Sequence, residues 1–141
     1  MTETASRLAT PCWIELPQAA DARGILTSIE SGLDIPFEPK RVFFITDGSG
    51  ERGNHAHRFT TQLIVSAAGS FAVDVSTGIG WTTYDMVERN RALFLPPMSW
   101  VRLRDFSSDA VCLVLADTSY AEAAYIRDWD EFVREAASKN S

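Results

Sequence analysis

The chain contains only two histidines, His55 and His57, and they stand two residues apart. On a β-strand, residues i and i+2 project from the same face, so both imidazoles would enter one pocket. Imidazole titrates near neutral pH and can accept or donate a proton, which suits such a pair to acid–base chemistry. The alternative is a pair of exposed histidines, or of core histidines with satisfied hydrogen bonds.

Short apolar segments separated by turn residues must position this pair. They are rich in Val, Ile, Phe, Thr and Trp, which is typical of strands, and Gly, Asp, Asn and Ser punctuate them. Many short strands at even spacing predict an all-β protein, an antiparallel sandwich or barrel. The predicted strands cover residues 25–30, 40–46, 62–67, 71–76, 81–87, 92–95, 100–104 and 111–116.

In the C-terminal tail, apolar residues recur with the period of an α-helix instead of that of a strand. Trp129, Phe132 and Ala136 recur at helical spacing, and Asp128 can cap the helix N-terminus. We therefore expect one short helix over residues 128–137 that packs against the strands. A functional role for this helix is the alternative.

Length and charge limit the classes of function. The chain has 141 residues, which fits a single domain over residues 1–141. Its formal net charge is −6, and the absence of a basic stripe argues against nucleic-acid binding. Short apolar runs and the lack of a basic amphipathic helix argue against a membrane role.

The N-terminus and the cysteines indicate a cytoplasmic protein. The first ten residues lack the pattern of a signal peptide, and we expect them to be flexible. Cys12 and Cys112 are the only cysteines and are expected to be thiols. Cys112 lies in an apolar run, which predicts a buried, inert side chain.

The spacing after the histidine pair resembles the cupin motif. In that motif a Glu follows His-x-His after three or four residues and a Gly follows six residues later; here Gln62 and Gly69 hold these positions. Residues 96–101 resemble the second cupin motif, with Val101 in place of its histidine. The resemblance implies a single-domain cupin, a jelly-roll antiparallel β-barrel with the short C-terminal helix appended.

The replaced cupin ligands argue against a metal centre. Metal-binding cupins use three His and one Glu, whereas Gln62 is an amide and Val101 offers no ligand atom. Zinc and iron sites normally have three protein ligands, and the two histidines leave such a site incomplete. We therefore expect no metal, with a metal-dependent cupin kept as an alternative.

Longer stretches resemble a narrower family, the sugar 3,4-ketoisomerases (WxcM-like cupins) that act on thymidine-diphosphate-linked 4-keto-6-deoxyglucose. The Arg-Gly-x-His-Ala-His stretch and the Tyr-Ile-Arg near the end are specific in combination. The matching stretches are residues 22–26, 35–45, 52–58, 105–109, 113–117 and 120–127.

This resemblance implies an isomerisation that moves the ketone from C4 to C3 of a dTDP-linked sugar, with no cofactor. A base removes the C3 proton, an enediol forms, C4 is reprotonated, and the two sugar oxygens exchange a proton. His55 and His57 inherit these roles, and the carbon base stays unassigned between them. The implied context is the synthesis of an unusual deoxyamino sugar for a surface glycan or an antibiotic.

The pyrophosphate of such a substrate requires cations, and the planar fork of arginine can bind two of its oxygens. Arg52, three residues before His55, is the first candidate. Each further arginine could instead be a solvated surface residue with no role in substrate binding. Each aromatic residue could instead be an ordinary part of the core. The other expected substrate contacts are Arg23, Arg41, Arg58, Arg102, Gln62, Phe43, Phe44 and Trp100.

The chain also departs from the family pattern. Phe43 and Phe44 stand where members usually carry tyrosines, Val101 where they often carry histidine, and the loop over residues 46–52 is shorter. Phenylalanine cannot donate a hydrogen bond to the sugar or relay a proton. A 3,5-epimerase-like cupin, whose base is a His supported by a carboxylate, and a non-catalytic sugar-nucleotide-binding module therefore remain alternatives.

The family resemblance implies a homodimer as well. In such dimers an N-terminal strand joins the sheet of the partner. Trp13 and Ile14, which follow a polar N-terminus, are compatible with this arrangement.

Overall fold

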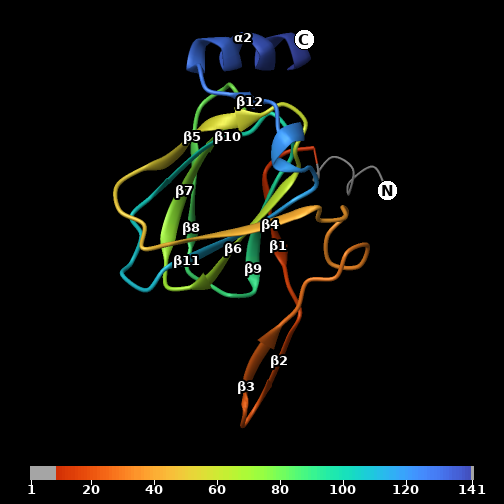
Figure 1. Ribbon diagram of the computed structural model, residues 1–141, viewed down its shortest axis with the longest axis vertical. Coiled ribbons are helices and arrows are strands. Elements are labelled where there is room, and N and C mark those ends of the chain that lie inside the picture. The colour runs from red at the N-terminus through yellow and green to blue at the C-terminus, as the bar shows by residue number, and fades with distance from the viewer. Residues whose placement is uncertain (1–8, 141) are drawn as a thin grey trace.

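Two five-stranded antiparallel sheets face each other in the computed structural model, which describes residues 9–140 (Figure 1). Flexibility was predicted for the first ten residues, and residues 1–8 of this stretch lie outside the described residues. The first sheet has the order β1 (Cys12–Glu15), β9 (Arg91–Leu95), β6 (Gln62–Ala68), β11 (Val111–Ala116) and β4 (Arg41–Thr46). The second has the order β12 (Tyr125–Ile126), β5 (Arg52–His57), β10 (Trp100–Arg104), β7 (Phe71–Ser76) and β8 (Thr82–Met86).

The predicted all-β fold with a C-terminal helix is confirmed. The remaining elements are the hairpin β2 (Gln18–Asp21) and β3 (Gly24–Thr27), the 3₁₀ turn η1 (Tyr120–Glu122) and the helix α2 (Trp129–Asn140). Within the described residues the two sheets share no strand pairing, so the barrel is not closed by hydrogen bonds. None of the described helices is long and apolar enough to cross a membrane.

The main core lies between the two sheets, where alternate residues of each strand point inward. Val73, Met86 and Leu93 are fully or almost fully buried there. Cys112 lies in the same cluster, and burial raises the pKa of its thiol to about 12. The predicted burial of Cys112 is therefore confirmed, and the raised pKa agrees with the expectation of an inert thiol.

Helix α2 covers the outer face of the second sheet. Phe132 and Ala136 pack against Trp100 and Ile126, and all four side chains are buried. Arg58, which directly follows β5, donates hydrogen bonds to the carboxylates of Glu131 at 2.7 Å and Glu135 at 2.8 Å. The helix thus packs as predicted, and it holds the end of β5 from outside.

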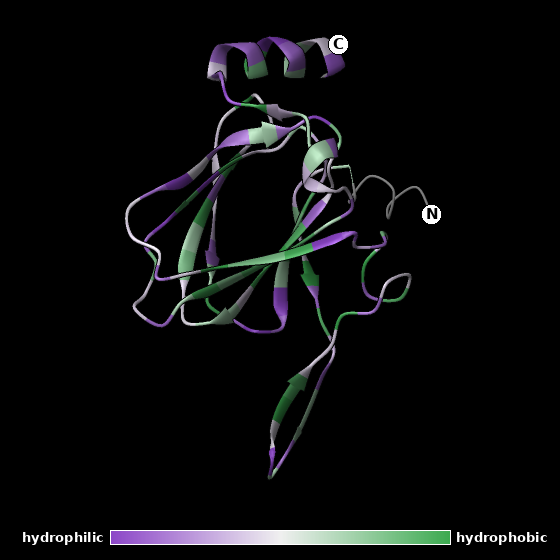
Figure 2. Ribbon diagram, viewed as in Figure 1, coloured by the Kyte–Doolittle hydropathy of each residue, from purple (hydrophilic) through white to green (hydrophobic). Residues whose placement is uncertain are grey.

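The hairpin of β2 and β3 projects from the opposite end of the molecule to α2 (Figure 1). Its two strands pair only with each other among the described residues. Ile25 and Leu26 keep 67% and 62% of their surface exposed, and β3 forms a hydrophobic stripe along the hairpin (Figure 2).

A buried carboxylate organises the outer face of β7, β8 and β10. Asp74 is 2% exposed and accepts hydrogen bonds from Arg102 at 3.0 Å, Arg104 at 2.7 Å and Thr83 at 2.7 Å. Hydrogen bonding from Arg104 is the largest cause that lowers the pKa of Asp74, and Thr83 and Arg102 add to it. The carboxylate is therefore ionised at neutral pH and ties three neighbouring strands together.

Replacement of Asp74 by Asn should destabilise the fold. The two arginines lose a buried charged acceptor but keep partial access to water, so we expect the free energy of unfolding to fall by about 2 kcal/mol. Urea denaturation at pH 7 measures this change. Asp85→Asn, at an exposed position of β8, is the matched control and should change stability little. Equal effects of the two substitutions would contradict the role of Asp74.

Candidate active site

A cavity of about 190 Å³ opens between the sheets, lined by residues from β4, β5, β6, β10, β11 and β12. Most of the lining is apolar. The polar side chains that line it are Arg52, His55, His57, Gln62 and Tyr125. The cavity therefore brings together the two predicted catalytic residues and three of the predicted substrate contacts, Arg52, Gln62 and Phe43.

Both imidazoles enter this cavity because β5 pairs with β10 on one side and β12 on the other. His55 lies opposite Val101, and His57 lies opposite Tyr125. The ring centroids of the two histidines are 5.1 Å apart. The expectation that the pair shares one face of a strand is thus confirmed.

A β-bulge brings Arg52 to the same face. Asn54 has no partner on β10, and both Gly53 and Asn54 have positive φ angles, 87° and 58°. The extra residue shifts the alternation of side chains, so Arg52, opposite Leu103, also faces the cavity. A Cβ atom at Gly53 would lie 2.7 Å from the carbonyl oxygen of Val101, which explains the glycine.

The environment keeps both histidines neutral. Burial is the main cause that lowers the pKa of His57 to about 3, and the charges of His55, Arg41 and Arg127 add to it. Burial also lowers the pKa of His55; a hydrogen bond with the backbone of Gly53 opposes this effect, and the charge of Arg127 reinforces it. At pH 7 each ring therefore has a free lone pair that can accept a proton.

Tyr125 closes the cavity beside the histidines. Its ring lies edge-on to His57 and His55, with centroid distances of 4.5 and 4.9 Å. The guanidinium of Arg127 lies over the same ring, 4.6 Å from its centroid. Neither residue was among the predicted site residues. In the sequence, only the Tyr-Ile-Arg stretch pointed to them. The strand pairing that brings them to β5 joins residues far apart in the chain, so the sequence pattern does not show it.

Two of the predicted arginines have no carboxylate partner among residues 9–140. Arg52 is exposed at the cavity, and Arg41 lies between Phe43 and Tyr120, 5.1 and 5.5 Å from their ring centroids. The Nε and Nη2 atoms of Arg41 and the Nε2 atom of His57 are buried without a hydrogen-bond partner in this range. These unpaired groups give this end of the cavity the capacity to bind oxygen atoms of a ligand.

Three other predicted contacts lie outside the cavity because of the alternation of side chains along their strands. On β10, Val101 faces the cavity, so Trp100 and Arg102 face the outer side. Trp100 packs under α2, and Arg102 pairs with Asp74. On β4, Phe44 is 66% exposed. None of these three side chains lines the cavity of its own chain.

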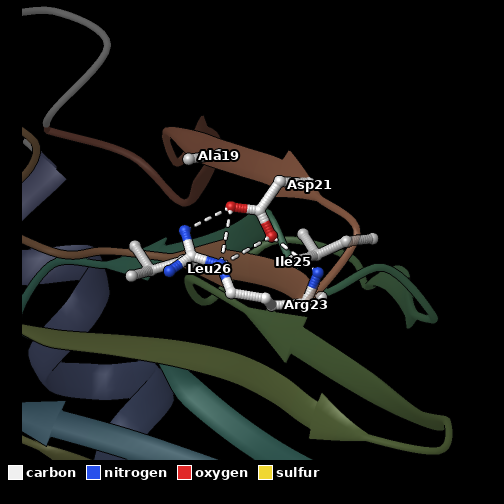
Figure 3. Close-up of a pocket in the computed structure, with 6 residues that line it drawn as sticks. Ala19, Asp21, Arg23, Ile25 and Leu26 are labelled. Atoms are coloured by element: carbon white, nitrogen blue, oxygen red, sulfur yellow. Dashed lines mark hydrogen bonds and ion pairs between the residues drawn. The ribbon is translucent and has the colours of Figure 1, made fainter.

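Two further arginines are engaged elsewhere. Arg58 pairs with the carboxylates of α2, as described above. Arg23 stands at the tip of the β2–β3 hairpin and folds back onto Asp21, with a shortest N–O distance of 2.6 Å (Figure 3). Neither side chain lines the histidine cavity of its own chain.

The donor set does not fit a metal ion. Among residues 9–140, no group of three or more His, Cys, Asp or Glu side chains is placed to bind one. At the cupin ligand positions, Gln62 supplies an amide and Val101 an aliphatic wall. The absence of a resident metal remains a prediction, and it rests on these side chains.

Comparisons with known proteins agree with this site. The FdtA family model, described as WxcM-like, C-terminal, matches residues 10–137. A TDP-4-oxo-6-deoxy-alpha-D-glucose-3,4-oxoisomerase from Aneurinibacillus thermoaerophilus is 38% identical over 129 residues, which cover 90% of this chain and 93% of the relative.

Solved structures show the same relationship. QdtA, a sugar 3,4-ketoisomerase from Thermoanaerobacterium thermosaccharolyticum in complex with TDP, superposes with a TM-score of 0.88 at 32% identity, covering 92% of this chain and 96% of that one. A 3,4-ketoisomerase from Helicobacter canadensis superposes with a TM-score of 0.86 at 34% identity, covering 90% and 97%. The chain belongs to the FdtA family of WxcM-like proteins.

Proposed function

We propose that this protein converts a TDP-linked 4-keto-6-deoxyhexose to its 3-keto isomer. The observation that carries the proposal is the pair of neutral imidazoles, His55 and His57, side by side in a cavity between the sheets. The relatives support it: one is named for this reaction, and a variant of QdtA was solved in complex with TDP-4-keto-6-deoxyglucose.

The imidazoles supply the carbon acid–base chemistry. A proton on C3 is acidified by the neighbouring C4 ketone, and a neutral ring of the pair can remove it. The resulting imidazolium can return the proton to C4. The apolar walls exclude water, which protects the enediolate and strengthens its interactions with nearby donors.

Unpaired cations give the cavity affinity for the pyrophosphate. The chain as a whole is acidic, yet none of the described residues that line this cavity is Asp or Glu. Arg52 lines it, and Arg41 and Arg127 lie close enough to lower the pKa of His57. We assign pyrophosphate binding to Arg52 first, because its guanidinium is exposed and has no ion-pair partner within the described residues.

The residues that line the cavity also argue against two of the alternative functions. An epimerase-like mechanism uses a histidine supported by a carboxylate, and neither histidine has a carboxylate neighbour in the cavity lining. A metal-dependent cupin would require ligands that Gln62 and Val101 do not supply. A non-catalytic binding module shares the geometry of the site, and the incubation described below distinguishes it.

We also infer a homodimer built through the β2–β3 hairpin. The hairpin projects from the fold, and Ile25 and Leu26 are exposed on it. Exposed apolar side chains in such a position are typical of a surface that a second chain buries. Strand β4 is an edge of its sheet, with Val42 and Phe44 exposed. Such an edge can accept a strand from a second chain. The predicted substrate role of Arg23 depends on this dimer, because Arg23 does not line the cavity and the hairpin projects away from β5 and β12, which carry cavity residues (Figure 1).

A cytoplasmic location is part of the proposal. Both cysteines, Cys12 and Cys112, are free thiols, which suits a reducing compartment.

Incubation with TDP-4-keto-6-deoxyglucose in deuterated water tests the reaction. We expect NMR spectra to show deuterium at a ring carbon next to the carbonyl and migration of the ketone to C3. His57→Asn should slow turnover by at least about 100-fold, because the amide cannot transfer a proton. Unchanged sugar together with tight TDP binding would identify a binding module, and full turnover by His57→Asn would contradict its catalytic role.

The protonation of the free protein is a second test. Since the folded-state pKa of His57 is about 3, its imidazole resonances should not shift between pH 8 and pH 5, whereas those of the urea-unfolded chain should titrate near the ordinary value of about 6.5. Protonation is then disfavoured in the folded state, so this histidine should reduce stability as the pH falls below about 6.5. A folded-state midpoint near 6.5 would contradict the proposed neutral pair.

The dimer can be tested by light scattering after size-exclusion chromatography. The wild-type chain should elute with the mass of two copies, and Ile25→Asp combined with Leu26→Asp should give a folded monomer. Ile79→Asp alters a similarly exposed apolar side chain outside the hairpin and should leave the dimer intact. A monomeric wild-type protein would refute this assembly.

A further inference from the structure

Gln62 holds a buried amide on the wall of the cavity. The residue stands at the start of β6, is 7% exposed and lines the cavity. Its side-chain amide forms no hydrogen bond with any residue in the described part of the chain. Burial of a polar group without a hydrogen-bond partner lowers the stability of a fold. The partner of this amide is therefore to be expected in a bound ligand.

The neighbours of Gln62 on the inward face of β6 make the contrast clear. Ile64, the next residue on this face, is apolar and also lines the cavity. Ser66, the one after it, is fully buried, but its hydroxyl donates to the carbonyl of Gly69 at 2.8 Å and accepts from Arg89 at 3.1 Å. One strand face thus carries a polar group that the fold satisfies and another that it leaves unpaired.

The connection between the two sheets places Gln62 across the cavity from the imidazoles. Only residues 58–61 separate His57, the last residue of β5, from Gln62, the first of β6, and the two strands belong to different sheets. Facing sheets pack roughly 10 Å apart. Both side chains line the same cavity, at the same end of the sheets. A sugar ring that lies against the imidazoles therefore has the Gln62 amide on its other side.

The proposed reaction creates a negative charge that requires a hydrogen-bond donor. When an imidazole removes the C3 proton, the electron pair of the C3–H bond forms the C3–C4 double bond, and the π electrons of the ketone move onto the C4 oxygen. An N–H group directed at this oxygen in a water-poor site lowers the energy of the enediolate. An amide donates such a hydrogen bond and keeps its proton, so it leaves all proton transfers to the histidines.

We propose that the side-chain N–H of Gln62 donates a hydrogen bond to the C4 oxygen of the enediolate and so lowers the barrier to removal of the C3 proton. This inference rests on the proposed ketoisomerase function and adds a catalytic residue that transfers no proton. The histidines carry the proton between the carbons and between the oxygens, and the amide stabilises the intermediate that both transfers share.

Gln62→Met tests this role, because methionine has a similar length and no N–H donor. With TDP-4-keto-6-deoxyglucose in deuterated water, exchange of the C3 hydrogen and migration of the ketone should slow by the same factor, at least about 100-fold. The loss should lie in kcat, with little change in KM or in the affinity for TDP measured by calorimetric titration. Urea denaturation should show a variant at least as stable as the wild type, because an unpaired buried amide has been removed.

Ser66→Ala is the matched control on the same face of β6. It removes a hydroxyl that the fold pairs, so it should lower the urea midpoint and leave exchange and migration unchanged. Gln62→Leu repeats the test if Gln62→Met does not fold. Wild-type kcat in the Gln62 variant, a loss confined to KM, or slower migration with normal exchange would each overturn the role of the amide. A wild-type protein that catalyses neither process would instead overturn the proposed function, and this inference with it.

Discussion

The pairing of β5 between β10 and β12 is the constraint on which the site depends. It directs both imidazoles inward, and it places Tyr125 opposite His57. Backbone hydrogen bonds set these positions, so the relative placement of the three rings is fixed before any ligand arrives. Helix α2 reinforces the arrangement from the outer face, through Arg58 at the end of β5 and the carboxylates on the helix. The reactive groups are therefore held by regular structure rather than by loops, which favours a preorganised site.

The electrostatics of the cavity differ from those of the chain around it. The whole chain has a net charge of −6, whereas the lining of the cavity, over the part of the chain that the structure describes, includes Arg52 and no carboxylate. Arginine charges and burial act in the same direction on the histidines and keep them unprotonated. The same charges attract a pyrophosphate. One set of cations can thus bind the anionic end of a substrate and maintain the basic form of the groups that act on its sugar.

Much of the fold could be predicted from the sequence, because strand composition and turn residues are local signals. The shared face of His55 and His57 followed from their spacing, and the family followed from several stretches taken together. Trp100 and Arg102 lie outside the cavity for different reasons. Trp100 is a large apolar side chain on the outer face of β10, where α2 covers it, so its type alone does not reveal which side faces the cavity. Arg102 follows the alternation with Val101 and Leu103 and pairs with Asp74 on the outer face. The pairing that brings Tyr125 to the site is equally invisible in a linear pattern.

The bulge at Gly53 and Asn54 makes the inward position of Arg52 tolerant of a change in strand length. Arg52 and His55 are three positions apart, and on a regular strand an odd separation would place the two side chains on opposite faces. The bulge takes up the odd residue, so both face the cavity. Loss of the single codon for Asn54 would leave Arg52 opposite Leu103, on the same face as before, whereas loss of both Gly53 and Asn54 would turn its side chain outward. A lineage built on this scaffold can therefore gain or lose one residue here and keep the arginine and the histidines in one cavity.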